Sequence, residues 1–299
     1  MNAASPPRRV ENLATDRGVI PQYATGVVEQ PWGDYSSSDH AVWAALFRRQ
    51  RELLPGRACA TFLANQQALA MSEDAIPRFD QLNRHLRAAT GWELVGVEGL
   101  LPEAVFFEHL AQRRFPVTWW IRRPDQLDYI AEPDLFHDLY GHVPLLMNPV
   151  FADYMQAYGQ GGLRAQREFG DEALLNLTRL YWYTVEFGLI REPAGLRIYG
   201  AGIVSSKGES IYCLESPAPN RIGFELERVM RTRYRIDSYQ KTYFVIDSFE
   251  QLFAATQQDF APIYARVAGA SAIPAGAVQD SDTTLHLGTR EGWAVGADV

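Results

Sequence analysis

Segments with apolar residues at helical spacing dominate this sequence and restrict it to a mainly helical fold. In residues 38–54, for example, Val42, Leu46 and Phe47 recur at this spacing, and Pro55 ends the run. The same reasoning predicts further helical segments, which cover residues 59–71, 79–90, 102–113, 133–141, 150–158, 171–190, 220–233 and 249–267.

Only short stretches have the aromatic and β-branched composition of strands. These stretches are "GWELVGV", "FPVTWWIR", "RIYGAGIVSS", "SIYCLES" and "KTYFVID". The predicted fold is therefore mainly α with a small β-sheet (α+β), as a single domain over residues 38–267. We expect residues 1–37 to form an N-terminal arm, partly docked or flexible, and the Ala-, Gly- and Ser-rich residues 268–299 to form a flexible C-terminal tail.

The charge of the chain argues against several classes of partner. With 299 residues, 47% of them apolar, it can bury a substantial core, but its net charge of -8 opposes a general affinity for nucleic acid or anionic membrane. No apolar run reaches the roughly 20 residues that cross a bilayer. The two cysteines, Cys59 and Cys213, fit no thiolate metal pattern, and a reducing compartment is the simpler interpretation. We expect a cytoplasmic protein.

Two histidines, His137 and His142, lie five positions apart in "EPDLFHDLYGHVP". In an uninterrupted α-helix such positions diverge by about 140°, so they would not share one ion. We therefore expect the helix to end at Gly141, with Pro144 opposing its continuation, so that His142 folds back toward His137. A helix cap with His137 in the core is the plainer alternative, and the spacing by itself favours it.

A carboxylate in an apolar helix changes this balance. Glu186 stands within "ALLNLTRLYWYTVEFGLI", where its helical neighbours are apolar or aromatic. A buried carboxylate is costly unless it is paired or coordinated. Arg179 could provide an internal ion pair, whereas two imidazoles and one carboxylate are the ligand set of mononuclear non-haem Fe(II) oxygenases. The sequence has no HExxH motif and no cysteine cluster, which argues against the common zinc sites.

Long blocks of the sequence resemble the catalytic core of the aromatic amino acid hydroxylases, and most closely their prokaryotic phenylalanine 4-hydroxylase branch. The blocks are "LPGRAC", "FFEHLAQRRFPVTWWIR", "EPDLFHDLYGHVPLL", "RLYWYTVEFGL", "IYGAGIVSSKGESIYC" and "RYRIDSYQKTYFVIDSF". The resemblance covers about residues 38–265 and implies an iron- and pterin-binding catalytic domain. It also implies a monomer, because the chain has no room for the regulatory domain and tetramerisation helix of animal relatives.

The resemblance assigns roles to individual residues. It implies His137, His142 and Glu186 as the Fe(II) ligands and as the catalytic centre. For the tetrahydropterin it implies Phe106 as the stacking ring, Gly99 and Leu101 as backbone contacts, and Tyr181 as a wall of the cavity. Asp138 would bond the pterin or an ordered water. For the substrate it implies Arg122 with Asp134 as the carboxylate anchor and Ser205 as part of a supporting turn. Trp182 and Pro133 would shape the ring pocket.

The implied reaction is the hydroxylation of L-phenylalanine to L-tyrosine with O2 and a tetrahydropterin, either tetrahydrobiopterin or a bacterial equivalent. Two alternatives stay open. Tryptophan hydroxylation would differ mainly in the shape of the ring pocket. A metal-stabilised sensor of aromatic amino acids would bind the ligand without turnover.

Overall fold

The computed structural model describes residues 26–130 and 132–293. Its helices are α1 (Ser37–Leu53), α2 (Ala60–Ala68), α3 (Phe79–Ala89), α4 (Glu103–Ala111), α5 (Val143–Leu146), α6 (Pro149–Glu168), α7 (Asp171–Tyr181), α8 (Ala201–Val204), α9 (Lys207–Glu215), α10 (Leu226–Met230), α11 (Phe249–Thr256) and α12 (Phe260–Ala268). Two short 3-10 helices are η1 (Trp32–Asp34) and η2 (Pro124–Gln126), and two π-helices are η3 (His137–His142) and η4 (Trp182–Glu186).

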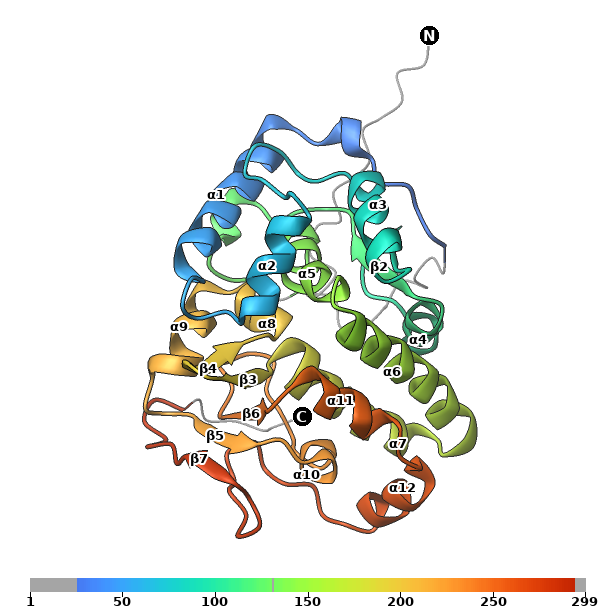
Figure 1. Cartoon of the computed structure of the whole chain (residues 1–299), viewed down its shortest axis with the longest axis vertical. Coiled ribbons are helices and arrows are strands. Elements are labelled where there is room, and N and C mark those ends of the chain that lie inside the picture. Colours follow the sequence, from blue (N-terminus) through green and yellow to red (C-terminus); the bar gives the residue numbers. More distant parts are fainter. Residues whose placement is uncertain (1–25, 131, 294–299) are drawn as a thin grey trace.

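The strands form two small sheets, so the predicted mainly helical α+β fold is confirmed. Strands β1 (Glu93–Val97) and β2 (Arg114–Thr118) pair in parallel. The second sheet has the order β4-β3-β6-β5-β7. Its strands are β3 (Leu189–Glu192), β4 (Gly195–Ile198), β5 (Asn220–Gly223), β6 (Thr242–Ile246) and β7 (Thr284–His286). Figure 1 shows this sheet in the lower half of the molecule, with α1, α2 and α3 above it.

Helix α6 lies at the centre of the helical part and contacts both α4 and α11 (Figure 1). Asn148 caps its N-terminus, where the Asn148 side chain accepts the backbone N–H of Phe151, and Pro149 suits the first turn. Gly162 allows α4 to approach closely, since a Cβ there would lie 2.1 Å from the Phe107 ring. Tyr154 and Met155 of α6 are fully buried, which fixes this helix as a rigid support for the elements beside it.

Some predicted boundaries differ in the structure. The stretch "SIYCLES" lies in α9, because Ser206 caps a helix there and Ser210 and Cys213 fall on its buried face. The stretch "RIYGAGIVSS" is divided between β4 and α8, and the predicted helix over residues 220–233 is divided between β5 and α10. Aromatic and β-branched composition alone could not separate a buried short helix from a strand.

The regions flanking residues 38–267 also make tertiary contacts. Val28 pairs with Gly96 of β1, and the Trp32 indole N–H donates to the Ile76 carbonyl at 2.8 Å. Residues 268–293 differ from the expected flexible tail, because β7 extends the five-stranded sheet and Ile273 bridges to Thr232. Residues 1–25 of the predicted arm and 294–299 of the predicted tail lie outside the described residues. Within the described part, no helix is both long and apolar enough to cross a bilayer.

Candidate functional site

The two histidines meet because the helix that carries them is a π-helix. The predicted helix end at Gly141 is wrong: η3 continues from His137 to His142, and α5 follows directly with Pro144 in its first turn. In a π-helix the hydrogen bonds run from residue i to i+5, which brings positions five apart toward one face. The two Nε2 atoms lie 3.1 Å apart. Gly141 is needed for packing instead, since a Cβ there would lie 2.9 Å from the Ala201 carbonyl oxygen.

Glu186 completes a cluster with the two histidines. It is the last residue of the second π-helix, η4. Its Oε1 lies 3.2 Å from His142 Nε2, and its Oε2 lies 3.6 Å from His137 Nε2. Burial alone would raise the pKa of Glu186, but the neighbouring imidazoles, His142 foremost, outweigh burial and lower it. The alternative ion pair is not formed, because Arg179 donates to the Asn176 side chain and to the Met230 carbonyl.

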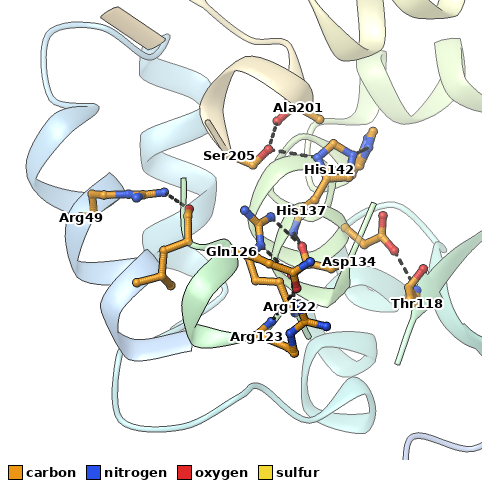
Figure 2. Close-up of polar contacts among 12 residues, drawn as sticks. Arg49, Thr118, Arg122, Arg123, Gln126, Asp134, His137, His142, Ala201 and Ser205 are labelled. Carbon is orange, nitrogen blue, oxygen red and sulfur yellow. Dashed lines mark hydrogen bonds and ion pairs between the residues drawn. The ribbon is translucent and has the colours of Figure 1, made fainter. Parts of the chain in front are cut away.

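The tautomer of His137 follows from its neighbours. Ser205 Oγ donates its hydrogen to the Ala201 carbonyl at 2.7 Å, so it can only accept from His137 Nδ1, which lies 3.0 Å away (Figure 2). His137 therefore carries its proton on Nδ1 and presents a bare Nε2 lone pair to the cluster. Burial, as the largest cause, lowers the pKa of His137 to about 4, which keeps the ring neutral near pH 7. A neutral imidazole held in this way suits a divalent metal.

A second carboxylate lies beside the histidines. The possible ligand atoms of His137, Asp138 and His142 all lie within 4.8 Å of one another. Asp138 Oδ2 already accepts the Thr118 backbone N–H at 2.7 Å, and burial raises the pKa of Asp138 to about 7. Glu186 has the lowered pKa and the short distances to both Nε2 atoms, so it fits the position of an ionised third ligand better than Asp138 does.

Arg122 and Asp134 form a buried bidentate pair next to this cluster (Figure 2). Arg122 Nε and Nη2 each donate to a different Asp134 oxygen at 2.8 Å. Asp134 also accepts the backbone N–H groups of Arg122 at 2.9 Å and of His137 at 3.0 Å. Burial would raise the pKa of Asp134, but its bonds to Arg122 outweigh burial and lower it. One carboxylate thus ties the arginine to the backbone of a histidine in the cluster.

Aromatic rings lead from the cluster toward α4. Tyr181 packs against His142, with ring centroids 6.4 Å apart, and against Phe106 at 5.7 Å. The structure therefore brings Tyr181 and Phe106 to the side of the histidine cluster, and Asp138 lies within it. The remaining two residues predicted to bind the pterin, Gly99 and Leu101, lie in the loop between β1 and α4 and are partly exposed.

The residues predicted to form the ring pocket lie at two places around the cluster. Pro133 is partly buried and directly precedes Asp134. Trp182 begins η4 and stacks on Tyr234, with ring centroids 4.3 Å apart. The Trp182 indole N–H donates to Gln240 Oε1 at 3.0 Å. Sequence reasoning missed Gln240, and also Thr118, because both contacts join segments far apart in the chain and carry no local signal.

Comparisons with known proteins agree with this geometry. The profile of the biopterin-dependent aromatic amino acid hydroxylases matches residues 18–267. A phenylalanine-4-hydroxylase of Ralstonia nicotianae is 65% identical over 272 residues, which cover 91% of this chain and 86% of the relative. One of Chromobacterium violaceum is 62% identical over 270 residues, or 90% of each chain.

Solved structures agree as well. A crystal structure of the C. violaceum phenylalanine hydroxylase with bound oxidised Fe(III) has a TM-score of 0.85 and 61% identity, and the match covers 87% of this chain and 94% of that one. Its cobalt-bound form has a TM-score of 0.84 and 62% identity, covering 87% and 92%. The chain belongs to the family of biopterin-dependent aromatic amino acid hydroxylases.

Proposed function

We propose that the chain is a phenylalanine 4-monooxygenase, which converts L-phenylalanine to L-tyrosine with O2 and a tetrahydropterin at one Fe(II). The convergence of His137, His142 and Glu186 carries this proposal, because two neutral imidazoles and one carboxylate are the ligand set of mononuclear non-haem Fe(II) oxygenases. The names of the most similar relatives supply the substrate.

The residues present fit the metal on chemical grounds. The Ser205 contact leaves His137 Nε2 free of its proton, and the lowered pKa of Glu186 keeps its carboxylate charged. Glu186 Oε1 lies 3.2 Å from His142 Nε2, close enough for both atoms to bind the same cation. When bound, Fe(II) and the tetrahydropterin supply the site of O2 activation and two electrons, and the substrate ring supplies the other two. One oxygen atom enters the ring and the other leaves as water.

The chain itself binds and orients the reactants. Asp134 binds one edge of the Arg122 guanidinium, formed by Nε and Nη2. The adjacent edge, formed by Nη1 and Nη2, is left to receive the substrate carboxylate in a planar fork. Phe106 and Tyr181 provide aromatic surface for the pterin plane, with backbone contacts from Gly99 and Leu101. Asp138 meets the pterin or a water beside it. Trp182 and Pro133 shape the ring pocket, and Ser205 supports the site through His137.

The setting of the enzyme is part of the same proposal. We assign residues 38–267 to the iron- and pterin-binding domain, with residues 1–37 as an arm and residues 268–299 as a C-terminal extension. The enzyme acts as a monomer in the cytoplasm on small molecules. Its net charge of -8 argues against nucleic acid as a partner.

Product analysis after anaerobic reconstitution with Fe(II) tests the proposal. Phenylalanine, tryptophan and tyrosine are each supplied with O2, with and without tetrahydropterin. We expect tyrosine from phenylalanine only when tetrahydropterin is present, and pterin consumed in step with product. Preferential hydroxylation of tryptophan would assign the chain to the tryptophan branch. Binding of phenylalanine without any product, in protein shown to contain iron, would indicate the sensor.

A further inference from the structure

The indole of Trp182 is held on several sides. It stacks on Tyr234 at 4.3 Å with an interplanar angle of 21°, and the Phe187 ring lies 4.7 Å away. The adjacent Tyr183 donates its hydroxyl hydrogen to the Arg233 carbonyl at 2.6 Å. This bond ties η4 to the loop after α10, which also carries Tyr234. Stacking fixes the plane of the indole but still allows it to slide or rotate within that plane.

A hydrogen bond to Gln240 removes this freedom. Gln240 is 2% exposed, and its Oε1 accepts the Trp182 indole N–H at 3.0 Å. Its Nε2 donates to the Arg235 carbonyl at 2.9 Å and lies 3.4 Å from the Ser238 carbonyl. Indole N–H groups only donate and backbone carbonyls only accept, so the amide has one satisfied orientation. A flipped amide would place its NH2 group against the indole N–H and its oxygen against the backbone carbonyls.

The backbone of Gln240 is anchored from a third direction. Its N–H donates to Glu209 Oε1 at 3.1 Å, and the same oxygen accepts the Tyr243 hydroxyl. Glu209 belongs to α9 and is 5% exposed. A continuous buried path therefore runs from α9 through Glu209 and Gln240 to the indole at the start of η4, whose other end is Glu186.

From these contacts we infer that Gln240 is a positioning residue for the ring pocket: it sets the orientation of the Trp182 indole and thereby the fit of the substrate ring. This inference rests on the proposed function, in which Trp182 lines that pocket. Gln240 would act only through the indole, and this requirement makes the inference testable by a double-mutant cycle.

The cycle compares the iron-loaded parent with Gln240→Met, Trp182→Phe and the double variant. Methionine keeps the length of the side chain but cannot accept the indole N–H, and phenylalanine has no N–H to donate. We expect Gln240→Met to raise the KM for phenylalanine roughly three- to tenfold and to lower the tyrosine formed per pterin consumed. Its KM for the pterin and its iron content should stay at the parent values. In the Trp182→Phe background, Gln240→Met should add less than about a twofold change.

Near-ultraviolet circular dichroism gives a second reading that does not depend on turnover, because a stacked, immobilised indole contributes to that spectrum. Gln240→Met should reduce the contribution that Trp182→Phe removes. Gln156→Met is the matched control: Gln156 also uses both ends of its amide, toward Arg113 and the Ala111 carbonyl, but contacts neither the indole nor the cluster. It should leave the KM for phenylalanine unchanged.

The inference would be overturned if Gln240→Met kept the parent's KM for phenylalanine and its yield of tyrosine per pterin consumed. It would also be overturned if the two substitutions changed the KM independently, so that the change in the double variant was the product of the two single changes. If Gln240→Met does not fold, Gln240→Glu replaces it in the cycle. Its carboxylate has no hydrogen to donate to the carbonyls of Arg235 and Ser238, so repulsion moves the acceptor away from the indole N–H. Gln240→Glu should therefore raise the KM in the parent background and not in Trp182→Phe. A parent protein that forms no tyrosine would instead contradict the proposed function.

Discussion

Asp134 makes a bidentate pair with Arg122 and also accepts the backbone N–H of His137. The proposed substrate anchor and one proposed metal ligand therefore share a single buried carboxylate. Any movement of Asp134 would displace both. A charge on Asp134 is tolerated at this depth because the guanidinium and two backbone donors surround it.

Replacing Arg122 by lysine tests the anchor. Lysine keeps the charge but loses the planar fork, and one lost charge-assisted hydrogen bond is worth about 1.5 to 3 kcal/mol. We expect kcat/KM for phenylalanine to fall about tenfold or more, with iron content nearly unchanged. Asp134→Asn should give a smaller loss of the same kind. Parent-like efficiency in Arg122→Lys would remove Arg122 from the substrate site.

Glu209 should make stability depend on pH. Burial is the largest cause that raises the pKa of Glu209 from 4.5 to about 7. The protonated form of Glu209 is therefore favoured in the folded state. The contribution of Glu209 to the free energy of unfolding is complete below about pH 4.5 and is lost as the pH rises through about 7. The shift corresponds to roughly 3 kcal/mol.

We expect Glu209→Gln, which stays neutral, to gain stability relative to the parent between pH 5 and pH 8 in urea denaturation. Glu250→Gln, an exposed substitution on α11, controls for the loss of one charge. Parallel pH profiles for Glu209→Gln and the parent would show that Glu209 is charged in the folded protein across this range.

At the scale of elements, two π-helices bring the cluster together, and the sequence could predict the residues but not these elements. His137 and His142 stood out by their spacing, and Glu186 by its apolar surroundings. The α-helical rule of 3.6 residues per turn then required a helix end at Gly141. Nothing local to the sequence distinguishes a π-turn from a helix end. The turn is stabilised by tertiary packing of η3 on α8, which joins segments about sixty residues apart.

Substituting Gly141 tests this packing. A Cβ at Gly141 would lie 2.9 Å from the Ala201 carbonyl oxygen and 3.1 Å from its Cβ, so η3 and α8 must separate. We expect Gly141→Ala to lower the free energy of unfolding by about 1 to 3 kcal/mol and to weaken iron retention, because Ser205 on the α8 side orients His137.

Gly161→Ala in α6 is the matched control. Apart from its chain neighbours and the backbone of its own helix, no atom lies within 4 Å of the added methyl group there, so this variant should match the parent or exceed its stability slightly. Equal stability and iron content in Gly141→Ala and Gly161→Ala would show that the contact between η3 and α8 is not needed.

At the scale of the whole molecule, the segment after α12 completes the fold. Its Ala-, Gly- and Ser-rich composition predicted flexibility, but Asp282 forms a buried ion pair with Arg228 of α10, with side chains 2% and 6% exposed. Arg228 also donates to the Ala277 carbonyl at 2.6 Å. Composition indicates how much apolar surface a segment can bury. It cannot predict the order of a segment that is held by one buried ion pair and by a strand at the edge of a sheet.

Removing this anchor should be costly. Asp282→Ala leaves Arg228 buried without its counter-charge, for which we expect a loss of about 3 to 5 kcal/mol in the free energy of unfolding. Asp247→Ala breaks the exposed pair with Arg191 and should cost less than about 1 kcal/mol. Equal, small losses in urea denaturation would show that residues 268–293 contribute little to the folded state.

Iron content after gel filtration tests the central claim, that His137, His142 and Glu186 hold one Fe(II), most directly. The parent, Glu186→Ala and Asp138→Ala are loaded anaerobically with Fe(II), filtered and analysed for metal. We predict about one iron per chain in the parent and in Asp138→Ala, and almost none in Glu186→Ala. Full iron retention in Glu186→Ala together with its loss in Asp138→Ala would contradict the account and make Asp138 the third ligand.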